Sequence, residues 1–304
     1  MEADILGLIS KIEHGSTNDG AGFRSVVYFS GCPLNCQWCH NPELISYRPQ
    51  LMYFQHKCVQ CNQCLAVCPQ VFSREDGRFT INATACTLCG HCTDICQGEA
   101  LQLSARPYTP EEVFNEIAAD KTFYAYSGGG VTFTGGECLM QHKFLKTLLQ
   151  LCGEAKIHTC VESCLAVPFS VVEEVAPLVD HFFVDIKHTD PGKHLQFTGK
   201  SNKEILGNIQ RLSTLGKAIT FRLPLIPGVN DDTENLTRTV DFIHSLPGRN
   251  ALELLRYNNL ARNKYDSIEK VFHNFGKPQD VQKMQALADA LDASYDDVCV
   301  FYRA

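Results

Sequence analysis

The sequence has little of what would indicate a nucleic-acid-binding, membrane-spanning or secreted protein. It contains no block of lysine and arginine, and its formal net charge of -7 over 304 residues argues against nucleic acid or an anionic membrane as a partner. No stretch approaches the roughly 20 apolar residues of a transmembrane helix. The opening segment MEADILGLISKIEHG carries acids but neither a basic head nor a small-residue cleavage site, so we expect a cytoplasmic protein.

Cysteine, in contrast, is abundant, with sixteen in the chain. Eleven of them fall between residues 32 and 96 in three tight groups, whereas a secreted disulfide scaffold would be short and would spread its cysteines along the chain. Close spacing in groups predicts metal binding. The other five are expected to be buried thiols, namely Cys138, Cys152, Cys160, Cys164 and Cys299.

The second and third groups form an internal repeat. Residues 58–69 read CVQCNQCLAVCP and residues 86–97 read CTLCGHCTDICQ, both with the spacing C-x2-C-x2-C-x3-C. This spacing matches the bacterial two-cluster ferredoxin pattern, in which the fourth cysteine of each run binds the other cluster. We therefore expect one 4Fe–4S cluster on Cys58, Cys61, Cys64 and Cys96 and another on Cys86, Cys89, Cys92 and Cys68. The alternative, two structural zinc sites, usually needs two C-x2-C pairs per site.

Residues 55–103 are accordingly predicted to be an inserted electron-transfer module, and residues 1–54 and 104–304 the main domain. In the main domain, apolar strand-like runs alternate with helical patterns, which predicts a parallel sheet curled into a complete or partial α/β barrel. Strands are expected at 24–31, 131–136, 156–163, 181–187, 218–228 and 251–258. Helices are expected at 110–120, 139–152, 167–179, 202–216, 232–246 and 280–293.

In such barrels the chemistry gathers on the loops that follow the strands. The unusual groups of this sequence all follow predicted strands, namely the Cys32 loop, Gly135-Gly136-Glu137, Glu162-Ser163, Asp185-x-Lys187 and Tyr257-Asn258. The sequence therefore predicts one functional face.

The first cysteine group, SGCPLNCQWCHNPE at residues 30–43, has the spacing C-x3-C-x2-C and no fourth cysteine. A 4Fe–4S cluster held by three thiolates has one open iron, which can bind a small molecule as an open zinc position binds water. From the spacing alone, a zinc site completed by His40 is the alternative.

These residues resemble the radical S-adenosylmethionine superfamily, whose signature C-x3-C-x-aromatic-C is met here by Cys32, Cys36, Trp38 and Cys39. The resemblance implies that the open iron chelates the amino and carboxylate groups of S-adenosylmethionine. One electron then cleaves the sulfonium and yields a 5′-deoxyadenosyl radical. The Gly135-Gly136-Glu137 turn resembles the motif that pairs with the methionine amino group, where glycine permits a close approach of backbone and ligand.

The resemblance narrows to the glycyl radical enzyme activating enzymes. STNDGAGFRSVVYFSGCPLNCQWCHNPE is similar to a DGPGIR stretch followed by a CxxxCxxCHNPE loop, with Ala21 and Phe23 as departures. SGGGVTFTGGE, FVDIKHTD and PLIPGVNDD are also similar to segments of that family. The fold implied is a partial (β/α) barrel of the radical S-adenosylmethionine type with an inserted bacterial-ferredoxin-like two-cluster domain. Such an insertion resembles the subclass that activates small-molecule lyases and dehydratases.

The resemblance also implies roles for individual residues. Cys32, Cys36 and Cys39 would hold the catalytic cluster. The remaining positions that match contacts of S-adenosylmethionine are Trp38, His40, Gly135, Gly136, Glu137, Glu162, Asp185, Lys187 and Asn258, the last standing where a histidine is usual. Asp19 and Arg24 would hold the glycine loop of the partner.

The function expected is that of an anaerobic oxidoreductase that abstracts a hydrogen from a glycine Cα in a partner glycyl radical enzyme. Its cofactors would be three 4Fe–4S clusters and S-adenosylmethionine, with flavodoxin or ferredoxin as electron donor and the chain acting as a monomer. The alternative is modification of a small molecule or peptide with the extra clusters as auxiliaries, which complete four-cysteine sets argue against. A simple electron-transfer protein would leave the three-cysteine loop unexplained.

Overall fold

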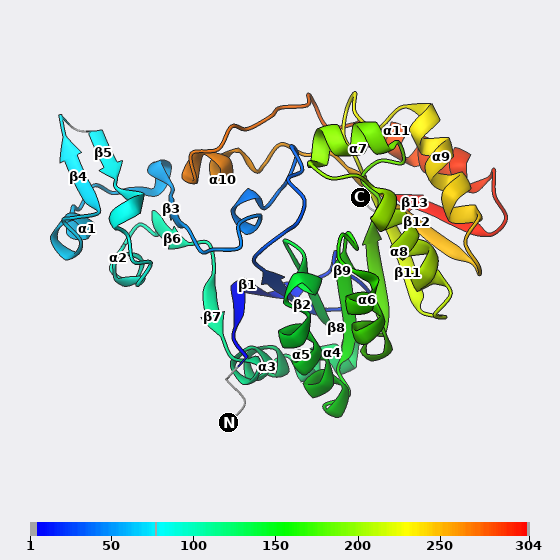
Figure 1. The fold of residues 1–304 in the computed structure, drawn as a ribbon, viewed down its shortest axis with the longest axis horizontal. Helices are drawn as coiled ribbons and strands as arrows, with labels where there is room; N and C mark the ends of the chain where they lie inside the picture. Colours follow the sequence, from blue (N-terminus) through cyan, green and yellow to red (C-terminus); the bar gives the residue numbers. More distant parts are fainter. Residues whose placement is uncertain (1–4, 77, 303–304) are drawn as a thin grey trace.

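The computed structural model describes residues 5–76 and 78–302. Within these residues, the main sheet has nine strands in the order β13-β12-β11-β10-β9-β8-β2-β1-β7 (Figure 1). From β2 onward, neighbouring strands are parallel and follow the chain. They are β2 (Arg24–Phe29), β8 (Gly130–Gly135), β9 (His158–Ser163), β10 (His181–Asp185), β11 (Ala218–Leu225), β12 (Asn250–Arg256) and β13 (Val298–Tyr302).

The barrel is partial rather than complete, because β13 and β7 end the described sheet without pairing with each other. β1 (Gly7–Ser16) extends the sheet by pairing antiparallel with both β2 and β7 (Arg106–Tyr108). Every strand predicted for the main domain is present, with ends shifted by a few residues. β1, β7 and β13 were not predicted.

Amphipathic helices cover the outer face of the sheet (Figure 1). The six predicted helices are confirmed as α3 (Pro110–Ala118), α5 (His142–Glu154), α6 (Phe169–Val175), α8 (Lys203–Ser213), α9 (Thr233–His244) and α11 (Val281–Asp292). α3 starts with a capping box between Thr109 and Glu112. α5 buries Phe144, whose ring packs edge-on against Phe29 of β2. The barrel is therefore held by helix faces packed on β-strands. Within the described residues of the main domain, three short α-helices were not predicted, namely α4 (Lys121–Ser127), α7 (Pro191–Thr198) and α10 (Arg262–Ser267).

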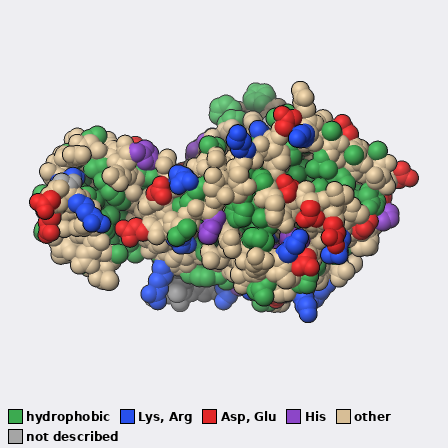
Figure 2. All heavy atoms as spheres, turned by 90° about the horizontal axis from the view of Figure 1, so that it is seen from above, with side chains coloured by type: hydrophobic (Ala, Val, Ile, Leu, Met, Phe, Trp, Pro, Cys, Tyr) green, Lys and Arg blue, Asp and Glu red, His purple; other side chains and the backbone are tan. Residues whose placement is uncertain are grey.

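The cysteine-rich segment leaves and rejoins the main body through one antiparallel pair, β3 (Leu51–Tyr53) with β6 (Leu101–Leu103). Between them lie α1 (Gln63–Val67), the hairpin β4 (Phe72–Glu75) and β5 (Arg78–Ile81), and α2 (His91–Asp94). The segment forms a separate lobe at one end of the molecule (Figures 1 and 2). It has a small core of its own around Val71, Phe72, Cys92 and Leu101, and α10 contacts it at β3.

No helix in the described part of the chain is long and apolar enough to cross a bilayer.

Candidate functional site

A cavity of about 240 Å³ lies at the carboxyl ends of the parallel strands. Its walls come from the loops after six strands, β2 and β8 to β12, as the alternation of strands and helices led us to expect. The predicted residues that line it are Cys32, Cys36, Trp38, Cys39, His40, Gly135, Gly136, Glu162, Asp185 and Lys187. The fold thus brings residues more than 150 positions apart in the sequence to one place.

The three-cysteine loop is fixed by its backbone. The amides of Asn35 and Gln37 donate to the carbonyls of Thr198 and Phe197, at 2.8 and 3.0 Å, which ties the loop to the end of α7. Trp38 packs against the rings of Phe197 and Phe275, which also contact each other. These contacts hold the loop against the barrel.

The thiols of this loop are suited to a positively charged centre. Burial raises the pKa of Cys39 to about 11 and that of Cys36 higher still, because a thiolate is poorly solvated in the cavity. A bound iron centre offsets that cost, since coordination deprotonates a thiol. The pKa of Cys32 is instead lowered, chiefly by a side-chain hydrogen bond with Cys164, which favours its thiolate. Three cysteines on one cavity wall, with no fourth from the loop, fit a cluster with an open iron.

Charged groups face the thiols across the cavity. Lys187 Nζ lies 2.9 Å from the carboxylate of Asp185, and both side chains are largely buried. Burial alone would lower the pKa of Lys187, but the Asp185 carboxylate and the nearby thiols outweigh it and raise that pKa. Lys187 is therefore a fixed positive charge, suited to a carboxylate of a ligand.

Glu162 is kept ionised by its neighbours. Burial acts to raise its pKa, but the Arg222 guanidinium, 2.7 Å away, and a hydrogen bond from Thr134 Oγ1 lower it below the ordinary value. An ionised carboxylate only accepts hydrogen bonds. Glu162 thus suits a ligand that donates hydroxyl groups, such as a ribose.

Glu137 follows the two cavity glycines but is absent from the described residues that line the cavity. Its side chain is 1% exposed. The carboxylate accepts from the amide of Cys164 at 2.9 Å, from Ser163 Oγ at 2.9 Å and from the amide of Leu139 at 3.1 Å. The structure thus gives the Glu137 side chain a bracing role for the loop after β9, while the backbone of Gly135 and Gly136 borders the cavity.

Asn258 is also missing from the described cavity lining. Its side-chain oxygen accepts from the amide of Leu260 at 3.2 Å, and its backbone makes a hydrogen bond with the ring of His40. Burial lowers the pKa of His40. In this structure Asn258 supports His40 rather than contacting the cavity with its side chain.

The two residues expected to hold a partner loop are placed differently from each other. Arg24 is fully buried, and its guanidinium donates to Thr132 Oγ1 at 2.8 Å, to the carbonyl of Val131 at 2.6 Å and to that of Ala21 at 3.2 Å. A direct contact of Arg24 with a partner is thus not available, because its donors are used within the chain. Asp19 is half-buried and pairs with Ser16 Oγ, so Arg24 orders the loop that presents Asp19.

Sequence reasoning missed Arg222 and Glu253. Arg222 Nε lies 2.8 Å from Glu253, another of its nitrogens contacts Glu162, and a third donates to the carbonyl of Asn18 at 3.1 Å. The signal was a charged residue inside each of two apolar strands, FRLPL and ALELL. Cys164 was expected to be only a buried thiol, but it borders the cavity and makes a side-chain hydrogen bond with Cys32.

In the cysteine-rich lobe, the eight cysteines border two small cavities in the crosswise sets expected. One cavity is lined by Cys58, Cys61, Cys64 and Cys96, and the other by Cys68, Cys86, Cys89 and Cys92. The repeat is also one of backbone geometry, since residues 60 and 62 and their counterparts 88 and 90 all have positive φ. The amide of Ala100 donates to Cys96 Sγ at 3.3 Å and that of Leu88 to Cys86 Sγ at 3.4 Å. Backbone donors directed at sulfur fit cluster-bound thiolates.

Comparison with known proteins agrees with this geometry. The family model described as the radical SAM superfamily matches residues 83–240, and that of the 4Fe-4S dicluster domain matches residues 51–97. The fold and the site thus define a radical S-adenosylmethionine protein with a ferredoxin-type insertion.

Two relatives identify the family to which the chain belongs within this superfamily. The trans-4-hydroxy-L-proline dehydratase activating enzyme of Clostridioides difficile is 36% identical, over 94% of this chain and 96% of its own length. The (2S)-3-sulfopropanediol dehydratase activating enzyme of Klebsiella oxytoca is 39% identical, over 86% and 85%. A radical SAM methyltransferase from Sphaerobacter thermophilus shares the fold, with a TM-score of 0.56 at 12% identity over 97% of this chain and 77% of the other. The chain belongs to the glycyl radical enzyme activating enzymes of the radical SAM superfamily.

Proposed function

We propose that this chain activates a partner glycyl radical enzyme by cleaving S-adenosylmethionine reductively and removing a hydrogen atom from the Cα of one glycine in the partner. The observation that carries the proposal is the cavity, where three cysteines meet an ion-paired lysine, an ionised carboxylate and a glycine turn. Each of these groups has a counterpart on S-adenosylmethionine. The relatives named above activate dehydratases, which supports a dehydratase or lyase as the partner.

The cysteines of the loop, Cys32, Cys36 and Cys39, would hold a 4Fe–4S cluster. When bound, this cluster supplies the electron that cleaves S-adenosylmethionine into methionine and a 5′-deoxyadenosyl radical. The protein side chains around it bind and orient the ligand. Lys187, kept charged by Asp185, attracts its carboxylate. Glu162 accepts hydrogen bonds from the ribose.

The remaining residues would contact the methionine end and the adenosine end of S-adenosylmethionine. The backbone of Gly135 and Gly136 borders the cavity near the amino group, and both positions require glycine because a Cβ would lie 2.3 Å from the backbone of Phe29 or 2.4 Å from the carbonyl of Gly31. Glu137 braces the neighbouring loop. Trp38 and His40 lie on the adenosine side, and Asn258 supports His40 through its backbone. The ligand is thus held from both ends.

The hydrogen atom moves from the partner glycine to the 5′ carbon, which gives 5′-deoxyadenosine and leaves the unpaired electron on the glycine Cα. Glycine is required because the absence of a Cβ exposes the Cα hydrogen. The loop at residues 18–23, ordered by Arg24, presents Asp19 toward the partner loop. The partner loop must leave its own core, so its capture costs local unfolding free energy.

The cysteine-rich lobe would hold two further 4Fe–4S clusters, giving three per chain. Two separate cysteine-lined cavities support this number. With every iron of these clusters bound by cysteine, we assign them to electron relay from a flavodoxin or ferredoxin. We divide the chain into the relay module at residues 55–103 and the barrel at residues 1–54 and 104–304. We further propose that the enzyme is a cytoplasmic monomer without nucleic-acid or membrane partners.

The function is tested with the glycyl radical enzyme encoded beside the gene of this chain. The two proteins, S-adenosylmethionine and a low-potential reductant are mixed without oxygen, and the electron paramagnetic resonance spectrum is recorded. A stable doublet on the partner is expected, and it should disappear when the radical-bearing glycine is replaced by alanine. Formation of 5′-deoxyadenosine with no protein radical, across several partners that retain an intact glycine loop, would contradict the proposal.

A further inference from the structure

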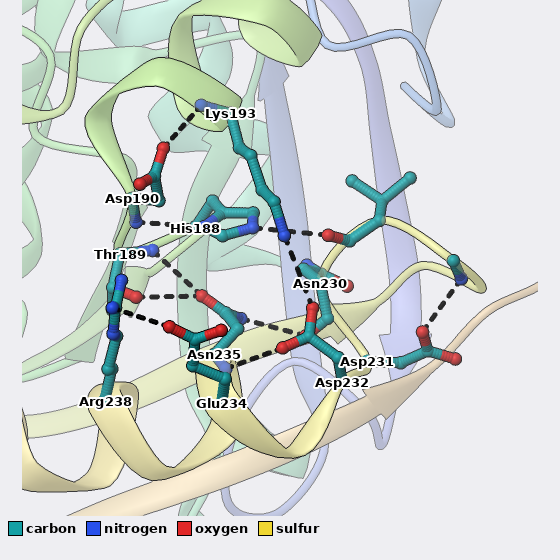
Figure 3. Close-up of polar contacts among 12 residues, drawn as sticks. His188, Thr189, Asp190, Lys193, Asn230, Asp231, Asp232, Glu234, Asn235 and Arg238 are labelled. Carbon is teal, nitrogen blue, oxygen red and sulfur yellow. Dashed lines mark hydrogen bonds and ion pairs between the residues drawn. The ribbon is translucent and has the colours of Figure 1, made fainter.

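Two sequence runs similar to family segments contain residues whose role is not yet explained, FVDIKHTD at residues 183–190, beyond its Asp185 and Lys187, and PLIPGVNDD at residues 224–232. Each supplies cavity wall, the first through Asp185 and Lys187 and the second through Pro224 and Ile226. Immediately beyond these wall residues, a network of polar side chains joins the two runs (Figure 3). The relative position of the two walls therefore depends on that network.

Asn230 is the member of the network that bonds directly to cavity-lining residues. It is 0% exposed. Its amide nitrogen donates to the carbonyl of Lys187 at 2.9 Å and to that of Pro224 at 2.7 Å, while its oxygen accepts from the amide of Ile226 at 2.6 Å. All three of these partners line the cavity. One buried side chain thus links the wall that carries the lysine to the neighbouring wall, which follows the adjacent strand β11.

Neighbouring side chains reinforce the same junction. The oxygen of Asn235 accepts from the amide and the hydroxyl of Thr189, at 3.1 and 2.9 Å, and its nitrogen donates to the carbonyl of Asn230 at 2.9 Å. The ring of His188 bonds to the carbonyl of Val229 at 3.2 Å and accepts from the amide of Asp190 (Figure 3). Burial lowers the pKa of His188, which keeps its ring neutral. The two loops are therefore joined by several hydrogen bonds besides those of Asn230.

We infer that Asn230 is a positioning residue for S-adenosylmethionine, which fixes the separation between the Lys187 wall and the Pro224–Ile226 wall of the cavity. The inference rests on the proposed function, because it assigns the ligand of that cavity. A neutral carboxamide is the side chain suited to this place, since two carbonyls require two donors and one amide requires an acceptor. Removing it takes a hydrogen bond away from each of three backbone groups beside the cavity.

The test compares Asn230 with Asn250, a matched buried amide at the opposite end of the barrel. Asn250 is 6% exposed and donates to the carbonyls of Ile243 and Gly248, both at 3.3 Å. Asn230→Ala and Asn250→Ala are reconstituted without oxygen, and S-adenosylmethionine binding is measured by calorimetry alongside thermal unfolding. Asn230→Ala should weaken binding by at least about tenfold, as supporting residues of a site do. Asn250→Ala should lower the thermal midpoint without changing affinity.

Asn230→Asp adds a second measurement, the pH dependence of affinity for S-adenosylmethionine. A residue that only stabilises the fold would not change this dependence. Its carboxyl would face two carbonyl oxygens, so its pKa would rise above the ordinary value of about 3.9. When protonated it still donates to one carbonyl and accepts from Ile226, whereas the ionised form repels both carbonyls. Affinity for S-adenosylmethionine relative to wild type should therefore fall as pH rises through that elevated pKa, measured from about 4.5 to about 8. Lys187, Asp185 and the neighbouring His188 are unchanged in both proteins, so the comparison cancels their titration.

Wild-type affinity in both Asn230 variants, with a thermal midpoint lowered as in Asn250→Ala, would overturn the inference. So would an Asn230→Asp affinity that keeps a constant ratio to wild type across the pH range, even if Asn230→Ala failed to fold. A wild-type protein that does not bind S-adenosylmethionine would instead contradict the proposed function itself.

Discussion

The three-cysteine loop and the cysteine-rich lobe use the same ligand in different surroundings. The loop cysteines border a cavity of about 240 Å³ that also contains Lys187, Asp185 and Glu162. The lobe cysteines border cavities of about 30 and 20 Å³ whose other lining residues are mainly apolar or uncharged. The cysteine spacing indicates a cluster in both regions, whereas the space and charge beside the cysteines distinguish the proposed substrate-binding cluster from the proposed relay clusters.

The largest expected effect separates the two regions directly. Cys36→Ala removes a ligand of the proposed cluster with an open iron, so S-adenosylmethionine cleavage should be abolished with any reductant. Cys61→Ala alters a proposed relay cluster, so single-turnover cleavage with a strong chemical reductant should survive while flavodoxin-driven turnover slows. Cleavage is measured as 5′-deoxyadenosine formed. Unchanged flavodoxin-driven turnover in Cys61→Ala would show that the lobe does not relay electrons to the first cluster.

The second effect concerns Glu137, whose carboxylate holds the loop after β9 in place beside the cavity. Glu137→Gln retains the shape but places an amide nitrogen against donors, so either the Leu139 amide or the Ser163 and Cys164 donors lose their acceptor. Each buried group left unpaired costs about 1–3 kcal/mol. The free energy of unfolding, measured with denaturant, should fall by that amount, and affinity for S-adenosylmethionine should fall with it. An unchanged affinity for S-adenosylmethionine would show that Glu137 does not support ligand binding. An unchanged free energy of unfolding would contradict the bracing contacts of its carboxylate.

The third effect uses pH. Because Arg222 holds the pKa of Glu162 below its ordinary value, this carboxylate contributes stability above that ordinary value, and the contribution is lost as pH falls toward the depressed one. In Arg222→Met the burial of Glu162 remains without the cation, so its pKa should rise. Affinity of Arg222→Met for S-adenosylmethionine should then decrease as pH falls from about 8 to about 6, relative to wild type. A pH-independent ratio of the two affinities would show that Arg222 does not tune Glu162.

The smallest effect is expected at Asn258. Since its side chain caps its own turn and only its backbone reaches His40, Asn258→Ala should change affinity by less than about 1 kcal/mol. Asn258→His should be tolerated. A loss in Asn258→Ala as large as that in Glu137→Gln would mean that the Asn258 amide contacts the ligand.

The cysteine sets and the barrel could be predicted from the sequence because the spacing of residues along the chain indicates both. The crosswise cysteine sets follow from a repeat, and the barrel follows from alternating strands and helices. β1 was missed because its antiparallel place at the edge breaks that alternation.

What spacing does not encode is the direction of a side chain and its distant partners. Arg24 and Glu137 were assigned by position in motifs, yet their buried contacts lie within the chain. The Arg222–Glu253 pair and the bonds of Asn230 to Lys187 join residues that become neighbours only in the folded barrel.

The most direct test of the contrast between the two regions is the electron paramagnetic resonance spectrum of the reduced protein with and without S-adenosylmethionine. Anaerobically reconstituted wild type should contain about 12 iron, and S-adenosylmethionine should alter the signal of one cluster. Cys36→Ala should keep about 8 iron and show no response to S-adenosylmethionine. A response that persists in Cys36→Ala, or wild type with about 4 iron and bound zinc, would contradict the account.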